Sequence, residues 1–137
     1  MDEIPKTFYR VSIKALILNE SRDKFLVILE DSGWWELPGG GLDWPERPGD
    51  CLRRELKEEM GLEVVEIKQN PSYFLVGENM KGKRSVNIVL ETKVKDLNFT
   101  PSEECLEIKF VSPEEVESIN AFRNVKELAE ILKNKQI

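Results

Sequence analysis

Apolar and polar residues alternate along residues 8–18, with Val11 and Ile13 on one side and polar residues on the other. An alternation of period two predicts a half-buried strand. A polar turn at 19–24 is followed by five consecutive apolar residues, 25–29, which predict a buried strand. Further strands are expected at 62–67, 72–76, 86–94 and 108–111.

Two helices are expected among these strands. Residues 48–60 begin with Pro48 and are followed by Gly61, the residues that favour the first helical position and the C-terminal cap. A second helix is predicted from Val125 to about Lys133, with Asn124 as its cap. Residues 34–49, rich in Gly, Pro and Trp, predict a long ordered loop, and Ser112 before Pro113 predicts a short helix start.

No repeat or long linker divides the chain, so we expect one α/β domain over residues 1–137. The longest apolar run, 25–29, is too short to span a membrane. Residues 1–6 lack the basic-then-apolar layout of a signal peptide. A cytoplasmic protein is therefore expected.

Composition narrows the chemistry. The net charge is −6, which argues against a dedicated nucleic-acid binder. The chain has no histidine, and this excludes Ser-His triads, Cys-His pairs and histidine-bound zinc. Cys51 and Cys105 form neither a disulfide framework nor a metal spacing, and Cys51 is interpreted as a small packing residue. Acid–base chemistry is left mainly to the 26 Asp and Glu residues.

The predicted helix at 48–60 gathers three of these carboxylates. At about 100° per residue, Glu55, Glu58 and Glu59 fall on one face, beside the apolar stripe of the same helix. Like charges at this spacing repel one another, and a divalent cation would remove the penalty. Arg54 is spaced to pair with Glu55 or Glu58, and the glycines of 39–41 allow backbone to approach a ligand closely.

The segment resembles the signature of the Nudix hydrolases: a Gly, five residues, a Glu, seven residues, then Arg-Glu-aliphatic-any-Glu-Glu-any-Gly-aliphatic. Every fixed position is present, namely Gly40, Glu46, Arg54, Glu55, Leu56, Glu58, Glu59, Gly61 and Leu62. The resemblance implies a Nudix α/β/α sandwich with a mixed β-sheet, and metal-dependent hydrolysis of a diphosphate link.

The resemblance also implies roles for individual residues. Glu58 and Glu59 would ligate the metal, Mg²⁺ or in its place Mn²⁺, with the Gly39 carbonyl as a further ligand. Glu55 matches a residue that serves as base in some members and as metal ligand in others. Arg54 would orient Glu55, and Glu46 would support the loop or a second metal.

A later loop often supplies another acidic residue in this family. Glu103, Glu104 and Glu107 are the candidates here, and we favour Glu104. Because the chain lacks histidine, a carboxylate is expected to take the proton of the attacking water.

Substrate-binding candidates have competing structural explanations. Trp44 could stack on a base or anchor the loop. Arg84, with Lys81 and Lys83, could clamp a phosphate or form a solvated turn. Asn124 corresponds to a base-reading Asn of MutT-type members, although a helix cap also explains it.

A small nucleotide-like diphosphate is the expected partner, without a membrane or a nucleic-acid polymer, and homodimerisation is left open. The leading substrate is a (deoxy)nucleoside triphosphate, and the runner-up is ADP-ribose or a nucleotide sugar. Residues 77–80 lack the Pro or Tyr that marks some specialised subfamilies. A non-catalytic nucleotide-binding module of the same fold is the alternative from another class, and an acidic metal-buffering or interaction domain is a third.

Overall fold

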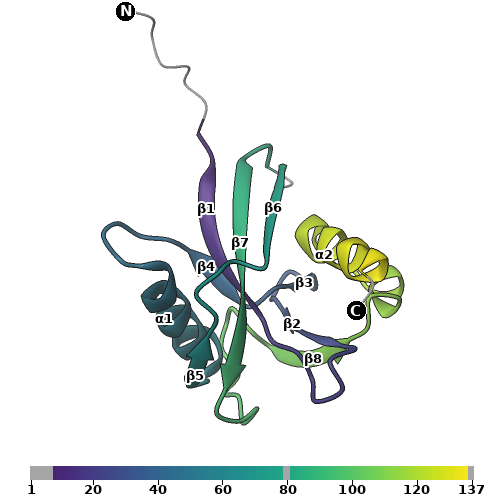
Figure 1. The fold of residues 1–137 in the computed structure, drawn as a ribbon, viewed down its shortest axis with the longest axis horizontal. Helices are drawn as coiled ribbons and strands as arrows, with labels where there is room; N and C mark the ends of the chain where they lie inside the picture. The colour runs from purple at the N-terminus through teal and green to yellow at the C-terminus, as the bar shows by residue number, and fades with distance from the viewer. Residues whose placement is uncertain (1–7, 79–80, 136–137) are drawn as a thin grey trace, which may run out of the picture.

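The computed structural model describes residues 8–78 and 81–135 (Figure 1). Residues 1–6 and 79–80, on which two of the expectations above rest, lie outside this range. The strands are β1 (Arg10–Leu16), β2 (Phe25–Leu29), β3 (Trp35–Glu36), β4 (Gly39–Gly41), β5 (Val64–Ile67), β6 (Tyr73–Glu78), β7 (Arg84–Val94) and β8 (Glu107–Val111). The helices are α1 (Pro48–Met60), the 3-10 turn η1 (Glu115–Ser118) and α2 (Arg123–Asn134).

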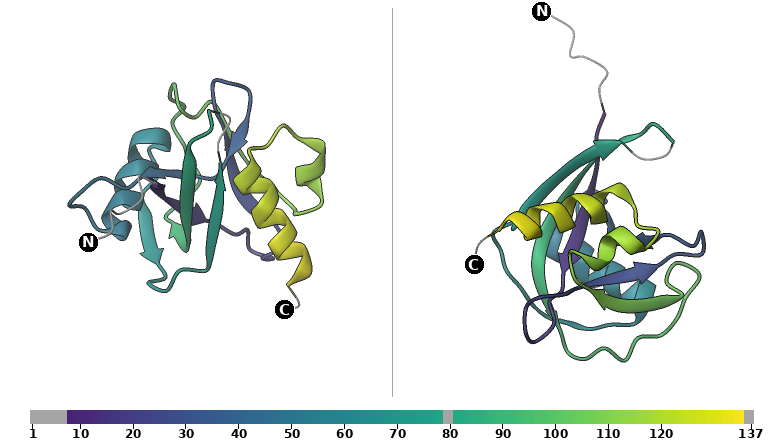
Figure 2. Two further views of the ribbon diagram at one scale, coloured as in Figure 1. Left: turned by 90° about the horizontal axis from the view of Figure 1, so that it is seen from above. Right: turned by 90° about the vertical axis from the view of Figure 1, so that its right-hand side faces the viewer.

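The strands lie between two helices, α1 on one side and α2 on the other, in all views (Figures 1 and 2). One sheet has the order β4-β1-β7-β5, with β6 also paired to β7, and a smaller sheet has the order β3-β2-β8. β1 and β7 are parallel, whereas the other strand pairs are antiparallel. The predicted α/β/α arrangement with a mixed sheet is confirmed.

The alternation of β1 divides the core into two layers. Ile13 and Ala15 pack in the cluster that includes Leu52 and Leu56 of α1. Leu16 packs in the other cluster, with Val125 and Leu128 of α2 among its members. Because successive side chains of a strand point to opposite faces, Ser12 and Lys14 lie on the same face as Leu16. On this face of the sheet, the polar residues Ser12 and Lys14 lie where β1 pairs with β4.

The sequence pattern located most elements well. β2 and α1 match their predicted bounds. Gly61 caps the C-terminus of α1 in the left-handed conformation, with a φ of 67°. The strands β3 and β4 were missed inside the expected loop, because each is only two or three residues long and is stabilised by pairing with distant strands. In the described residues, no helix is long and apolar enough to cross a membrane.

The prediction that Asn124 caps the last helix is wrong. α2 begins at Arg123, and Phe122 occupies the cap position without a side-chain cap bond. Asn124 therefore lies in the first turn, where its side chain can reach across to the sheet. The expected helix start at Ser112 is a 3-10 turn, and the Ser112 hydroxyl accepts a hydrogen bond from the Glu115 N–H at 3.2 Å.

The backbone conformation and the space at Gly39, where β4 pairs with β1, leave no room for a side chain. The φ of Gly39 is 128°, and a Cβ there would lie 2.1 Å from the Ile13 carbonyl oxygen. We predict that Gly39→Ala lowers the free energy of unfolding by about 3 kcal/mol or more, since both the backbone conformation and the space exclude a side chain.

The matched control is Gly49→Ala in the first turn of α1. A Cβ at Gly49 meets only the Ile67 side chain, at 3.8 Å, and alanine favours a helix by about 0.5–1 kcal/mol. In urea unfolding, the free energy of unfolding should fall for Gly39→Ala and rise for Gly49→Ala. A Gly39→Ala protein as stable as the wild type would refute this interpretation.

Candidate active site

Glu59 is the buried acidic side chain of α1. Only 6% of the residue is exposed, and one carboxylate oxygen accepts a hydrogen bond from the Gly39 N–H at 3.2 Å. Burial raises the pKa of Glu59 to about 8, with Lys14 and the Gly39 N–H acting against the shift and Glu55 and Glu104 adding to it. The protonated form of this carboxyl group is therefore favoured by its surroundings.

Glu55 lies against the neighbouring glycine. A Cβ on Gly40 would be 2.4 Å from the carboxyl carbon of Glu55, so a side chain there would displace this carboxylate from its position beside β4. The signature glycine therefore allows the close approach of a side chain from α1.

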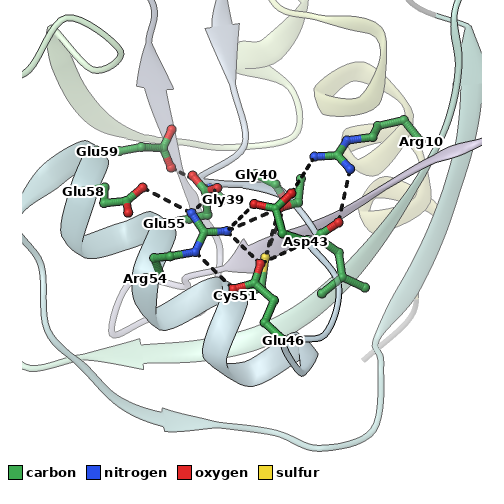
Figure 3. A network of polar contacts seen from close by, with 12 residues as sticks. Arg10, Gly39, Gly40, Asp43, Glu46, Cys51, Arg54, Glu55, Glu58 and Glu59 are labelled. Carbon is green, nitrogen blue, oxygen red and sulfur yellow. Dashed lines mark hydrogen bonds and ion pairs between the residues drawn. The ribbon is translucent and has the colours of Figure 1, made fainter.

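Arg54 connects the acidic residues of the helix to the preceding loop (Figure 3). Its guanidinium donates to both oxygens of Glu46, at 3.0 and 2.7 Å, and also to Glu55 at 3.0 Å and Glu58 at 3.2 Å. The paired guanidinium lowers the pKa of Glu46 to about 2, and the same hydrogen bonds raise the pKa of Arg54. The predicted pairing of Arg54 with Glu55 and Glu58 is confirmed.

Glu46 also supports the loop, as one of its two expected roles requires. Its carboxylate accepts a hydrogen bond from the Asp43 N–H at 3.0 Å, and the Glu46 N–H donates to the Asp43 carbonyl at 2.8 Å. This turn directs its tip, Trp44 and Pro45, away from the protein. Trp44 is 95% exposed and lines neither cavity described below, so the structure does not bring this stacking candidate to the site.

An acidic cavity of about 460 Å³ opens beside β4 and α1. Its lining consists of Ser12, Lys14, Glu30, Asp31, Gly39, Gly40, Gly41, Glu55, Glu59, Glu103 and Glu104. The structure thus brings together the predicted Gly39, Glu55, Glu59, Glu103 and Glu104, while Glu107 is not in the lining. Glu30 and Asp31 were missed, because they follow β2 and meet the site only through sheet pairing. Burial, with Glu36 nearby, raises the pKa of Glu30.

Glu58 lies apart from this cavity. Its side chain is 59% exposed and is held by Arg54 at 3.2 Å. Within the described residues, no three acidic or cysteine side chains converge closely enough to hold a metal ion as they stand. The donor set nevertheless fits a hard divalent cation, because the cavity lining offers several carboxylate oxygens, and the ionised form of Glu59 is disfavoured by burial and also by two like-charged neighbours.

A second cavity, of about 240 Å³, lies between the same sheet face and the start of α2. Ser12 and Lys14 line both cavities, so the two adjoin along β1. The remaining lining is Arg10, Glu36, Leu75, Val76, Gly77, Glu78, Lys83, Arg84, Ser85, Asn87, Phe122, Arg123, Asn124 and Glu127. Of the substrate-binding candidates, Arg84 and Asn124 are present here.

Asn124 is held by polar groups of the sheet. Its side-chain N–H groups donate to Glu36 at 2.6 Å and to Asn87 at 3.3 Å. Glu36 and Asn87 were not singled out from the sequence, although Glu36 is the polar residue directly before the Leu-Pro-Gly-Gly run.

The cysteine near the acidic helix has a structural role. Cys51 is fully buried, with its sulfur 3.5 Å from the Gly41 carbonyl oxygen. Burial raises the pKa of its thiol to about 12, and a thiol that stays protonated is a poor nucleophile. Its interpretation as a packing residue is confirmed.

A sequence model of the NUDIX domain matches residues 8–134. The chain belongs to the Nudix family. Among solved Nudix-like folds, the E. coli ORF135 protein has a TM-score of 0.75 at 20% identity and covers 96% of this chain and 94% of its own. The MutT protein from Methanosarcina mazei Go1 has a TM-score of 0.72 at 24% identity and covers 96% and 100%.

The curated relatives of this Nudix chain include the RNA pyrophosphohydrolase of a Nitratiruptor species, 37% identical over 67 residues. That match covers 45% of this chain and 43% of the relative. The chain spans less than half the length of the first curated relatives that it matches.

The raised pKa of Glu59 predicts a pH dependence of stability. The folded protein keeps this proton up to about pH 8, whereas the unfolded chain releases it near the ordinary value of 4.5. The folded state therefore binds more protons in this window, so the free energy of unfolding falls as pH rises through it. At about 1.4 kcal/mol per pKa unit, we expect a loss of about 2–4 kcal/mol between pH 5 and 8 without metal.

The control is Glu59→Gln, which keeps an oxygen acceptor for the Gly39 N–H but cannot ionise. Urea unfolding in a chelator should show a smaller loss of stability for this variant than for the wild type. At pH 8, Mg²⁺ should stabilise the wild type but not the variant. Equal pH slopes for the two proteins would contradict the burial argument.

Proposed function

We propose that this Nudix chain is a metal-dependent hydrolase of the diphosphate link in a nucleotide-like molecule. The observation that carries the proposal is the adjoining pair of cavities. One is acidic and contains the buried Glu59, and the lining of the other, among the described residues, combines three arginines, two lysines and two amide side chains with three glutamates. A molecule with a metal-bound diphosphate at one end and a larger polar group at the other fits this division of charge.

The carboxylates of the acidic cavity would hold the cation. We infer that Glu59 and Glu55 are ligands, with the Gly39 carbonyl as a further hard oxygen donor. Glu58 would join them on release from Arg54, which its exposed side chain, 59% accessible, leaves it free to do. Mg²⁺ is the preferred ion and Mn²⁺ its substitute; bound there, it supplies charge neutralisation to the diphosphate and acidity to a water.

Three carboxylates that line the cavity are candidates for the base that takes the proton from the attacking water, namely Glu55, Glu103 and Glu104. Glu55 is held by Arg54, which orients it. Glu104 reaches the same cavity from the loop before β8. We propose Glu104 as the base, because Glu55 is committed to Arg54 and to the cation.

The second cavity would bind the remainder of the substrate. We propose that Arg84 contacts phosphate or sugar oxygens and that Asn124 contacts a base, with Glu36 and Asn87 holding the amide in a fixed orientation. Trp44 could contribute only if the loop moved.

The leading substrate is a (deoxy)nucleoside triphosphate, giving the monophosphate and pyrophosphate. ADP-ribose or a nucleotide sugar is the runner-up. The names of the relatives favour a second candidate, the phosphorylated 5′ end of an RNA, against the expectation that no polymer binds. The non-catalytic module is disfavoured because every carboxylate of the signature is retained.

A panel of substrates tests the function. Nucleoside triphosphates, ADP-ribose, a nucleotide sugar and a 5′-triphosphorylated RNA oligonucleotide would be incubated with and without Mg²⁺, and the products identified by phosphorus NMR. We expect metal-dependent release of pyrophosphate from a triphosphate, and loss of most turnover in Glu59→Gln. Binding without cleavage in every case would support a non-catalytic module.

The base assignment has its own test. Glu104→Gln should lower kcat by about 10²–10⁴-fold at an unchanged metal affinity. The control is Glu107→Gln, a nearby substitution of an exposed glutamate outside the cavity, which should be neutral. A near-normal kcat in Glu104→Gln would contradict this assignment and leave Glu55 and Glu103 as the candidates.

A further inference from the structure

Lys14 is the buried cation at the junction of the two cavities. It belongs to β1, lies in register with Gly39 of β4, and is 7% exposed. Its neighbour along the same face, Ser12, also lines both cavities. Any molecule that occupies both cavities must pass over these two residues.

The contacts of the Lys14 ammonium within the protein are long. The Leu37 carbonyl oxygen lies at 3.4 Å and the nearest Glu36 oxygen at 3.9 Å. Charge-assisted hydrogen bonds of an ammonium are typically about 2.7–2.9 Å, and an ammonium carries three donors. Among residues 8–78 and 81–135, the protein therefore holds this cation out of water with no anionic oxygen closer than that of Glu36, at 3.9 Å.

The charges around Lys14 come from several elements. Glu36 of β3, Glu30 after β2 and Glu59 of α1 all lie within its electrostatic reach. These carboxylates offset the cost of burying the ammonium, but Lys14 also repels a metal ion in the same cavity. A polyanion that contacts both the metal ion and the Lys14 ammonium is attracted to each of them, and its negative charge offsets the repulsion between the two cations.

We propose that Lys14 binds a non-bridging phosphate oxygen of the substrate, on the phosphate that lies between the metal-bound group and the second cavity. The proposal rests on the proposed function and assigns Lys14 as a substrate-contacting residue. The Ser12 hydroxyl lies beside it as a second donor to the same phosphate. The competing explanation is purely structural: Lys14 serves only as a counter-ion for Glu59 and Glu36.

Binding of a non-hydrolysable ligand separates the two explanations. The probe is a nucleoside triphosphate with a methylene group in place of the α–β bridging oxygen, titrated calorimetrically at saturating Mg²⁺. Lys14→Met should weaken the Kd by about 10- to 100-fold, the range expected for a charge-assisted hydrogen bond. Lys14→Arg should recover part of the affinity, and KM for the hydrolysed substrate should rise by a similar factor.

Lys93→Met is the matched control, since it removes the same charge from β7 outside both cavities. It should leave the Kd unchanged. The structural explanation predicts a lower Tm for Lys14→Met with a Kd within twofold of the wild type, and this result would overturn the proposal. Lys14→Gln, which retains a hydrogen-bond donor, provides the measurement if the methionine variant does not fold.

The outcomes also separate this proposal from the proposed function. If the wild type binds the analogue in a Lys14-dependent manner but cleaves no diphosphate, the hydrolase function fails and the phosphate contact stands. If the wild type is an active hydrolase and Lys14→Met binds and cleaves as well as Lys93→Met, the contact fails and the function stands.

Discussion

The burial of the Glu59 carboxylate against the backbone of Gly39 is the constraint on which the site depends. α1 packs its apolar stripe onto the sheet, and the residue at the border of that stripe is an acid. Its carboxylate accepts a hydrogen bond from the backbone N–H of Gly39, a residue whose φ of 128° favours glycine. The position of α1, the conformation of β4 at Gly39 and the burial of Glu59 therefore depend on one another.

Burial makes the ionised form of Glu59 unfavourable. Desolvation holds the Glu59 pKa near 8, and Glu55 and Glu104 add repulsion. The protein offsets part of the repulsion along the helix through Arg54, whose guanidinium contacts Glu46, Glu55 and Glu58. The remaining unfavourable electrostatics are local to the acidic cavity, and they are the reason that we propose this cavity as the metal site.

The sequence predicted what depends on neighbours along the chain. The spacing within α1 was sufficient to predict its bounds, the shared face of Glu55 and Glu59, and the pairing of Arg54. The spacing did not predict that Glu58 would be held outside the cavity, because helical periodicity gives a direction but no rotamer. Gly40 was expected to permit close approach, and the partner proved to be Glu55 from the same signature.

What the sequence missed depends on contacts between distant segments. Glu30 and Asp31 reach the acidic cavity from the end of β2, and Lys14 reaches it through pairing of β1 with β4. Asn124 has the features of a helix cap in the sequence, but α2 begins before it, with Phe122 at the cap, and this frees the amide to contact Glu36. A short turn directs Trp44 outward, which no local pattern indicated.

The most direct test of the central claim is a crystal structure of the protein soaked in Mn²⁺ at pH 8, read by anomalous scattering. We predict a manganese peak in the acidic cavity, about 2.2 Å from a Glu59 carboxylate oxygen, the distance expected for a hard divalent ion of this size. A fully occupied peak elsewhere, with Glu59 still bonded to Gly39 and no metal within reach, would contradict the account.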